Sequence, residues 1–159
     1  MLKLSLNALT FKPAQSERYS KMHEIRVYTA SKLRHAEMFR DLRHKVDGVY
    51  FTARWPVTIQ LASEAAKSSA QMQQDNFDDI SRSHAVIVYV EKGEHLKGGL
   101  VEVGYAIAHG KMVYVVGQHE DYSKWQFHPN VRRCGTVEQA LADIKVTFKP
   151  KVKLVDSHA

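Results

Sequence analysis

Apolar and polar residues change period several times along the chain, and each change predicts a new element of secondary structure. Residues 25–30 alternate and are rich in β-branched and aromatic side chains, which predicts a strand. Residues 32–48 carry apolar side chains near helical spacing and end in a glycine, which is typical of a helix and its C-terminus. Residues 49–56 repeat the strand pattern and residues 57–74 are rich in good helix formers, so a second strand and helix are expected.

The alternation of elements continues with two strongly apolar strands. Residues 75–83, DNFDDISRS, predict a short helix whose acidic first turn favours the positive end of the helix dipole. Residues 84–90, HAVIVYV, carry no polar residue after the histidine, which is typical of a strand covered on both faces, and we expect it at the centre of the sheet. A helix at 100–109, closed by Gly110, and an apolar strand at 111–117 follow.

The two ends of the chain are less regular. Residues 117–135 form a long polar segment, and residues 136–146 predict an amphipathic helix with Thr136 as its N-cap. Residues 1–23 are expected to form an N-terminal extension, whose LKLSL alternation adds an edge strand or stays loose. Residues 149–159 are expected to form a surface tail.

Strands that alternate with helices predict an α/β fold for residues 24–148. We expect a doubly wound, mostly parallel five-stranded sheet with helices on both faces, flavodoxin- or Rossmann-like, built from right-handed crossovers. In such sheets, ligands bind beyond the carboxyl ends of the strands. The candidate ligand loops are therefore those at 29–34, 53–56, 91–99 and 117–130.

Composition agrees with one globular domain. The 159 residues are 44% hydrophobic and 25% charged. No run approaches the roughly 18 apolar residues of a membrane-spanning helix, so no membrane partner is expected. The single Cys134 rules out an intrachain disulfide and fits a cytoplasmic location.

The net charge of +6 is concentrated in the first third of the chain. Residues 1–54 carry 11 Lys and Arg against 5 Asp and Glu. Such an excess suits a nucleic acid or a phosphorylated small molecule, or it only forms a solvated face. Because no nucleic-acid-binding motif accompanies the charge, we do not expect a nucleic-acid partner.

Several common site motifs are absent from the sequence. It contains no Walker loop, no GxGxxG dinucleotide fingerprint and no GxSxG nucleophile elbow. Its nine histidines are scattered and only one cysteine accompanies them, so no metal and no cofactor are expected.

One acidic residue, Glu102, interrupts the apolar and glycine-rich stretch GGLVEVGYAIAHGK at 98–111. A helical wheel places it opposite the apolar positions and beside Tyr105 and Ala106. On that basis it is either an ordinary solvent-facing residue or a charged group held for chemistry near the helix start, where free backbone N–H groups favour a carboxylate and Gly98 and Gly99 leave room for a ligand. Tyr105 and Ala106 on an outer face indicate a covering partner subunit.

Four stretches together resemble the nucleoside 2-deoxyribosyltransferase family and its nucleotide-hydrolysing relatives. They are VYTAS, DNFDDI, AVIVYV and GGLVEVGYAIAHGKMVYVVG, and they span residues 25–117. The resemblance implies that Glu102 is a nucleophile at the anomeric carbon of a sugar and that Tyr28 orients it. It also implies that acidic residues contact the substrate, for which the candidates are Asp75, Asp78 and Asp79. Without the resemblance, these three acids only cap and charge the start of a helix.

The sequence departs from the family at one position. Transferases of this family carry an Asp six residues before the nucleophile, where this chain has Leu96. This puts base exchange in doubt more than bond cleavage, and Glu94 or His95 are the candidate substitutes.

The segment after the first strand offers phosphate-binding groups. The hydrolase relatives hold a 5′-phosphate with Ser and Arg here, and Ser31, Lys32 and Arg34 lie at similar positions. The other interpretation of Ser31 is an N-cap for the first helix. Trp55, before a proline, either stacks on a base or packs in the core.

The resemblance implies cleavage of the N-glycosidic bond of a (deoxy)nucleoside or nucleoside 5′-monophosphate, by hydrolysis or transfer, through a covalent glycosyl-enzyme. It also implies a homodimer or higher homo-oligomer. Two alternatives remain open. Toll/interleukin-receptor-like domains share the architecture and use a Glu to cleave NAD, and the missing Asp is also compatible with a module that binds a nucleotide without cleaving it.

Overall fold

The computed structural model describes residues 24–46, 48–52 and 68–149. Helices and strands alternate along these residues, as the periodicity predicts. In chain order they are β1 (Ile25–Ser31), the short 3-10 helix η1 (Leu33–His35), α2 (Ala36–Lys45), β2 (Val49–Phe51), α3 (Ser69–Ser81), β3 (Ala85–Tyr89), α4 (Gly98–Ala108), β4 (Met112–Val116), the 3-10 helix η2 (Lys124–Phe127), β5 (Val131–Cys134) and α5 (Val137–Thr147).

The five strands form one parallel sheet in the order β2-β1-β3-β4-β5. This is the flavodoxin-like order, and it confirms the predicted fold class and the central place of β3. In this order the chain passes from β1 to one edge and then returns to β3 beside β1. The space beyond the carboxyl ends of β1 and β3 is thus the topological switch point, where such sheets bind ligands.

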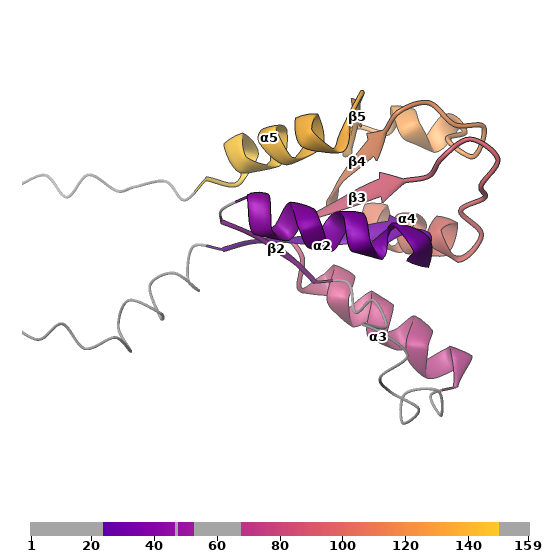
Figure 1. Ribbon diagram of the computed structural model, residues 1–159. Coiled ribbons are helices and arrows are strands. Elements are labelled where there is room, and N and C mark those ends of the chain that lie inside the picture. Colours follow the sequence, from indigo (N-terminus) through magenta and orange to yellow (C-terminus); the bar gives the residue numbers. More distant parts are fainter. Residues whose placement is uncertain (1–23, 47, 53–67, 150–159) are drawn as a thin grey trace, which may run out of the picture.

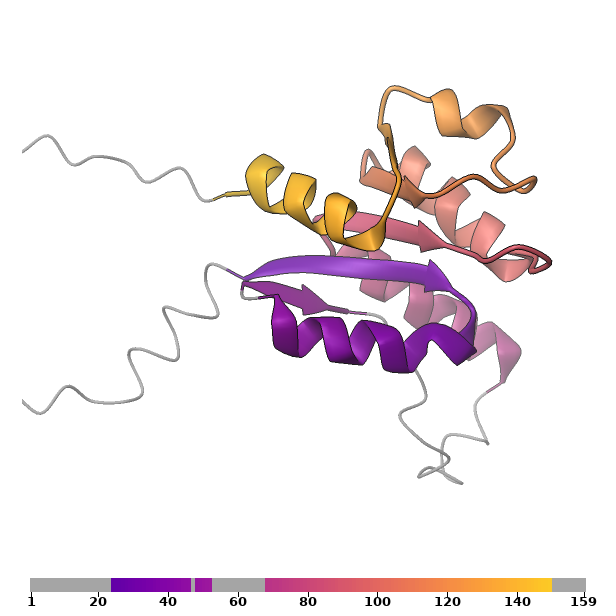
Figure 2. The same cartoon turned by 45° about the horizontal axis from the view of Figure 1, so that its top comes forward.

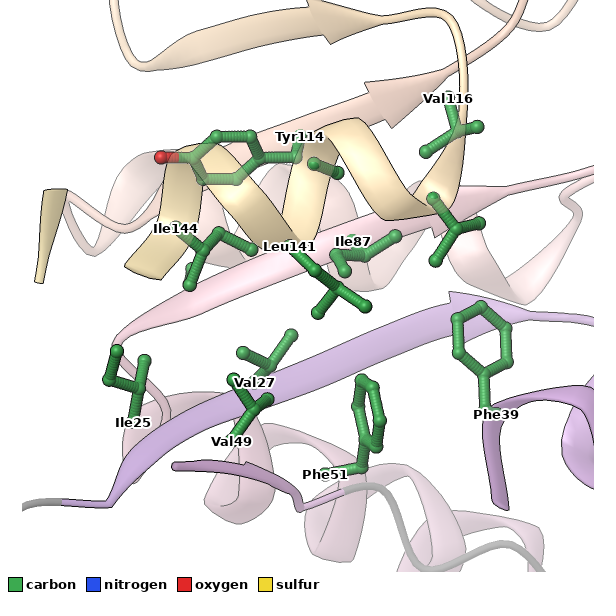
Figure 3. Close-up of a cluster of buried hydrophobic side chains, with 13 residues drawn as sticks. Ile25, Val27, Phe39, Val49, Phe51, Ile87, Tyr114, Val116, Leu141 and Ile144 are labelled. Carbon is green, nitrogen blue, oxygen red and sulfur yellow. The ribbon is translucent and has the colours of Figure 1, made fainter. Parts of the chain in front are cut away.

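The helices cover both faces of the sheet (Figures 1 and 2). Helices α2 and α5 lie on one face, where Phe39 of α2 and Leu141 and Ile144 of α5 pack on side chains of the strands (Figure 3). The strand residues in this core include Val27 and Ile87, both fully buried. At about 25 cal/mol for each Å² of buried apolar surface, this layer supplies a large share of the hydrophobic stabilisation.

Helices α3 and α4 cover the opposite face. Because strand side chains alternate between faces, Tyr28 and Ala30 of β1 point to this layer, together with Val86 and Val88 of β3. The pleat of β1 therefore turns Tyr28 toward the helix that carries Glu102.

The structure corrects the prediction of two separate helices around residue 75. A single helix, α3, runs from Ser69 to Ser81, and the Ser68 hydroxyl caps its start by accepting the Gln71 N–H at 3.1 Å. The acids of DNFDDI thus lie in the second half of a helix and not in its first turn. The expected helix at 57–74 falls partly outside the described residues.

The structure also locates the fifth strand, which the sequence did not place. It is β5, within the segment expected to be a polar connection, and it pairs with β4 at the edge of the sheet. Only Val131 of its four residues is buried, and Arg132 and Arg133 are exposed. An edge strand this short and this polar lacks the apolar signal that marks a central strand. The LKLSL segment lies outside the described residues.

Candidate active site

Helix α4 presents Glu102 to the inside of the protein, and this corrects the helical-wheel prediction. Glu102 is only 9% exposed and lies on the buried face with Val103 and Ala106, whereas Leu100 is exposed. The wheel failed because it assigned the apolar side chains to the core, while the helix buries its carboxylate and leaves part of its apolar surface outside. Glu102 is also the fifth residue of α4, and so it lies beyond the first turn.

The side chains of Tyr28 and Asn76 hold the Glu102 carboxylate. The Tyr28 hydroxyl donates a hydrogen bond to it, and Asn76 Nδ2 donates to Glu102 Oε1 at 2.9 Å. Burial raises the pKa of Glu102 to about 7, although both hydrogen bonds act to lower it. Burial, together with the nearby Glu102 charge, also raises the pKa of Tyr28 above its ordinary range, so the hydroxyl keeps its proton and remains a donor.

Asn76 is the contact that sequence reasoning missed. It belongs to the DNFDDI stretch from which three aspartates were chosen as candidates, yet its amide is the group of that stretch that contacts Glu102. The sequence did contain a signal for Asn76: it lies three residues before Asp79, so the two side chains share one face of a helix. That inference required α3 to begin at Ser69 rather than at residue 75.

The three candidate aspartates have separate environments. Asp75 accepts a hydrogen bond from Gln71 at 3.1 Å, and Asp78 is exposed and accepts one from Gln74 at 3.1 Å. Asp79 is buried, accepts from Arg82 at 2.6 Å and acts electrostatically on Tyr28. Asp79 therefore belongs to the surroundings of the Tyr28–Glu102 pair.

A cavity of about 190 Å³ opens beside Glu102, between the ends of β1 and β3. This first cavity is at the topological switch point of the sheet. Its lining consists of Ser31, Lys32, Leu33, Val90, Leu96, Lys97, Gly98, Gly99 and Glu102. Gly98 has open space where a Cβ would stand, whereas a Cβ on Gly99 would lie 3.1 Å from the Leu96 side chain.

Ser31 faces this cavity and does not cap a helix. It is the last residue of β1, the N-cap position of η1 belongs to Lys32, and no side chain caps that helix. The Ser31 hydroxyl is buried and has no hydrogen-bond partner among the described residues. Since a buried hydroxyl without a partner is costly, a ligand in this cavity would satisfy it.

The loop between β3 and α4 is fastened to the β1–α2 junction through Glu94. The Glu94 carboxylate, which is buried, accepts from His35 Nε2 at 2.8 Å and from the Glu91 N–H at 2.7 Å, and it forms an ion pair with Arg34. Burial alone would raise the pKa of Glu94, but these donors outweigh it and lower the pKa to about 2. Glu94 thus joins the two chain segments that wall the first cavity.

We expect the substitution Glu94→Gln to lower the melting temperature at neutral pH. A carboxyl with a depressed pKa in the folded state stabilises it above the unfolded pKa of about 4.3, and that contribution is lost as the pH falls toward 2. Thermal unfolding followed by circular dichroism at pH 7 and pH 3 should show a smaller difference from wild type at pH 3. Glu120→Gln, at an exposed glutamate, is the control. A difference that is equal at both pH values would contradict the role of the ionised carboxylate.

The same loop is fastened on its other side by Asp121, which follows β4. Asp121 Oδ2 accepts the Leu96 N–H at 2.7 Å, and Oδ1 lies 3.4 Å from His95 Nδ1. The Leu96 side chain is buried in the apolar layer, at the position where the family resemblance led us to look for an Asp. Glu94 and His95, the candidate substitutes, are thus committed to other partners and do not line the first cavity.

Two further sequence predictions concern Trp55 and the pair Tyr105 and Ala106. Trp55 lies outside the described residues. Tyr105 and Ala106 do not form a free outer face: Ala106 is fully buried, and Tyr105 stacks on Phe77 and shares a hydrogen bond with the Ser81 hydroxyl. Ala106 therefore cannot contact another subunit, and the subunit contact through this helix stays a prediction.

The searched residues show neither a metal cluster nor a membrane span. Within the described ranges, no group of three or more His, Cys, Asp or Glu side chains could hold a metal ion. No helix among the described residues is long and apolar enough to cross a bilayer.

The chain is similar to known proteins in sequence and in fold. The family model described as nucleoside 2-deoxyribosyltransferase matches residues 7–141. Among solved structures, the chain is similar to the CMP N-glycosidase BcmB of Clostridium botulinum, with a TM-score of 0.50 and 15% sequence identity over 76% of this chain and 98% of that chain. At this identity the likeness concerns the fold. No curated protein matches the chain.

Proposed function

The chain belongs to the nucleoside 2-deoxyribosyltransferase family, and we propose that it cleaves the N-glycosidic bond of a (deoxy)nucleoside or its 5′-monophosphate with Glu102 as the nucleophile. The observation that carries the proposal is the Glu102 carboxylate, buried beside a cavity at the switch point and held by two neutral donors. A carboxylate held in this way is preorganised to attack a sugar carbon in the cavity.

The proposed reaction has two steps. An oxygen of Glu102 forms a bond to C1′ while the C1′–N bond breaks, and the electron pair leaves with the base, which takes up a proton. An acceptor then attacks C1′ from the opposite side, loses a proton and releases the carboxylate. Tyr28 and Asn76 hold the attacking group through both steps, because each donates to the carboxylate and neither competes for the sugar.

The lining of the cavity favours water over a second base as the acceptor. Family transferases use an Asp at the position of Leu96, and here that side chain is apolar and buried. Among the described residues that line the first cavity, Glu102 is the one carboxyl group. Apart from Glu102, the lining of the first cavity thus offers no carboxyl group that could exchange protons with an incoming base, so hydrolysis is the proposed outcome.

Release of free base tests the proposal. The full-length protein is incubated with nucleosides and 5′-monophosphates of the common bases, in ribose and 2′-deoxyribose form, and free base is measured by chromatography. Release of a base supports the proposal. Release of nicotinamide from NAD instead would identify the NAD glycohydrolase alternative, and tight binding in calorimetry without any product would identify the non-catalytic module.

We also propose that the protein self-associates through the outer face of α4. Leu100 is 41% exposed and Val101 is 54% exposed, and Gly104 and Ala108 on the same helix are exposed as well. An exposed helix face without charged residues is typical of a surface that another subunit covers.

The substitution Val101→Glu is expected to shift the protein toward monomer, because it places a charge in the centre of this face. Light scattering coupled to size-exclusion chromatography measures the shift. Val146→Glu is the matched control, since Val146 is 69% exposed on α5, a helix on the opposite face of the sheet. A wild-type monomer, or equal effects of both variants, would contradict this contact.

A further inference from the structure

A second cavity, of about 460 Å³, adjoins the one beside Glu102. The two share Lys32, Leu33 and Lys97 in their walls, so they form one continuous groove along the ends of β1 and β3. The remaining lining of the second cavity consists of Arg34, Gly93, Glu94 and His95. If the sugar occupies the first cavity with C1′ at Glu102, a substituent that leaves the sugar toward Ser31 and Lys32 enters the second.

The charges in this second cavity favour an anion. Its lining carries three cationic side chains, Lys32, Arg34 and Lys97, against one carboxylate, Glu94, which pairs with Arg34 and His35, so the net charge of the lining is positive. No ion pair or hydrogen bond engages the ammonium groups of Lys32 and Lys97 within the described part of the chain. These two groups therefore stand at the junction of the cavities and are free to bind a ligand.

Lys97 is also held in a conformation that its residue type disfavours. Its φ is +44°, and it is the single non-glycine residue with positive φ among those described. Such a conformation is unfavourable and persists where the surroundings enforce it, often at ligand sites. Asp121 accepts the backbone N–H of Leu96, and Glu94 forms an ion pair with Arg34. These two contacts hold the loop just before Lys97 and so keep Lys97 at the junction of the two cavities.

The second cavity is larger than a single phosphoryl group requires. One phosphoryl group beside Ser31 and Lys32 would leave most of this space, with Arg34 and His95, without a ligand. A longer anionic substituent fills it and reaches both lysines.

We propose that the groove binds a pyrophosphate group, so that the preferred substrate is a nucleotide with two or more phosphoryl groups on its 5′ carbon. Ser31 and Lys32 contact the phosphoryl group nearer the sugar, and Lys97 and Arg34 contact the farther one. The inference rests on the proposed function for the chemistry at C1′, but the anion site itself is independent of that chemistry. A nucleoside diphosphate and a dinucleotide share this pyrophosphate group.

Base release at limiting concentration compares 2′-deoxynucleoside 5′-mono-, di- and triphosphates and NAD. We expect kcat/KM for the diphosphate to exceed that for the monophosphate by about tenfold or more, as for charge-assisted contacts. A preference for NAD over the diphosphate would identify a dinucleotide as the source of the pyrophosphate. Lys97→Met should remove most of the advantage and Lys97→Arg should retain it, whereas Lys32→Met should lower kcat/KM for the monophosphate and the diphosphate alike. Lys92→Met, in the same loop but outside both cavities, is the control.

Calorimetry separates failure of this inference from failure of the proposed function. Inorganic pyrophosphate should bind the wild-type protein more tightly than inorganic phosphate, and Lys97→Met should abolish the difference while Lys92→Met does not. That result supports the pyrophosphate site even if no base is released. Equal binding of the two anions, or monophosphates cleaved as well as diphosphates, would overturn the inference and leave the proposed function intact.

Discussion

Replacement of Glu102 by glutamine is expected to abolish base release and, at the same time, to stabilise the fold. Glutamine keeps an oxygen that accepts from Tyr28 and Asn76, but it cannot form the glycosyl ester. Loss of a nucleophile lowers kcat by several orders of magnitude, so a loss of at least about 10³-fold is expected. Chromatography of the released base measures it.

The gain in stability follows from the raised pKa of Glu102. Because the folded state holds the proton up to a pKa of about 7, the folded protein binds more protons than the unfolded chain between pH 4.5 and 7. The free energy of unfolding of the wild type therefore falls as the pH rises through this window, by about 3 kcal/mol in all. Glutamine carries no charge, so the free energy of unfolding of the variant does not fall in this way as the pH rises.

The two proteins should therefore melt at similar temperatures near pH 4.5, and Glu102→Gln should melt higher at pH 8. For a chain of this size, each kcal/mol corresponds to roughly 2–4 °C. Glu120→Gln, which changes the same charge on the surface, should alter neither activity nor stability. Full activity of the Glu102 variant, or a lower melting temperature at pH 8, would contradict the assigned site.

The second large effect is the pH dependence of base release. If the ionised carboxylate is the nucleophile, kcat/KM falls about tenfold for each pH unit below the pKa of Glu102, which is about 7. Between pH 8 and pH 5 the loss is about 100-fold. Initial rates at low substrate concentration measure the profile, and circular dichroism at each pH shows whether the protein stays folded.

Tyr28→Phe gives this profile a second, independent check. The substitution removes one of the two hydrogen bonds that lower the pKa of Glu102, so the acidic limb should move to higher pH. Asn76→Leu removes the other bond and should act in the same direction. A flat profile between pH 5 and 8, or an unshifted limb in both variants, would show that Glu102 does not control the reaction.

The burial that makes the Glu102 carboxylate reactive also lowers the stability of the fold. The protein keeps a carboxylate out of water, where its ionised form is unfavourable, and it supports this group with neutral donors instead of a cation. A cation beside Glu102 would lower its pKa and make it a weaker nucleophile. Glu94 shows the opposite arrangement: Arg34 and His35 lower its pKa, and its role is to hold the loop.

Much of the fold could be predicted from the sequence, because the spacing of apolar residues indicates which side chains are buried. The uninterrupted apolar run of β3 marked the central strand, and the glycine after α4 marked the end of that helix. The same logic missed β5, whose edge position gives it one buried residue, and it divided α3 in two because an acidic cluster resembles a helix start.

The sequence by itself determined the parallel α/β architecture, because this depends on spacing along the chain, and its resemblance to the family made Glu102 the candidate nucleophile. The tertiary structure decided which face of α4 is buried, that Asn76 rather than Asp75 or Asp78 contacts the carboxylate, and that Ser31 faces a cavity instead of capping a helix. Those outcomes depend on how α3 and α4 pack on the sheet. A helical wheel cannot anticipate a helix that buries its one acid, because the compensating hydrogen bonds come from residues 74 and 26 positions away in the chain.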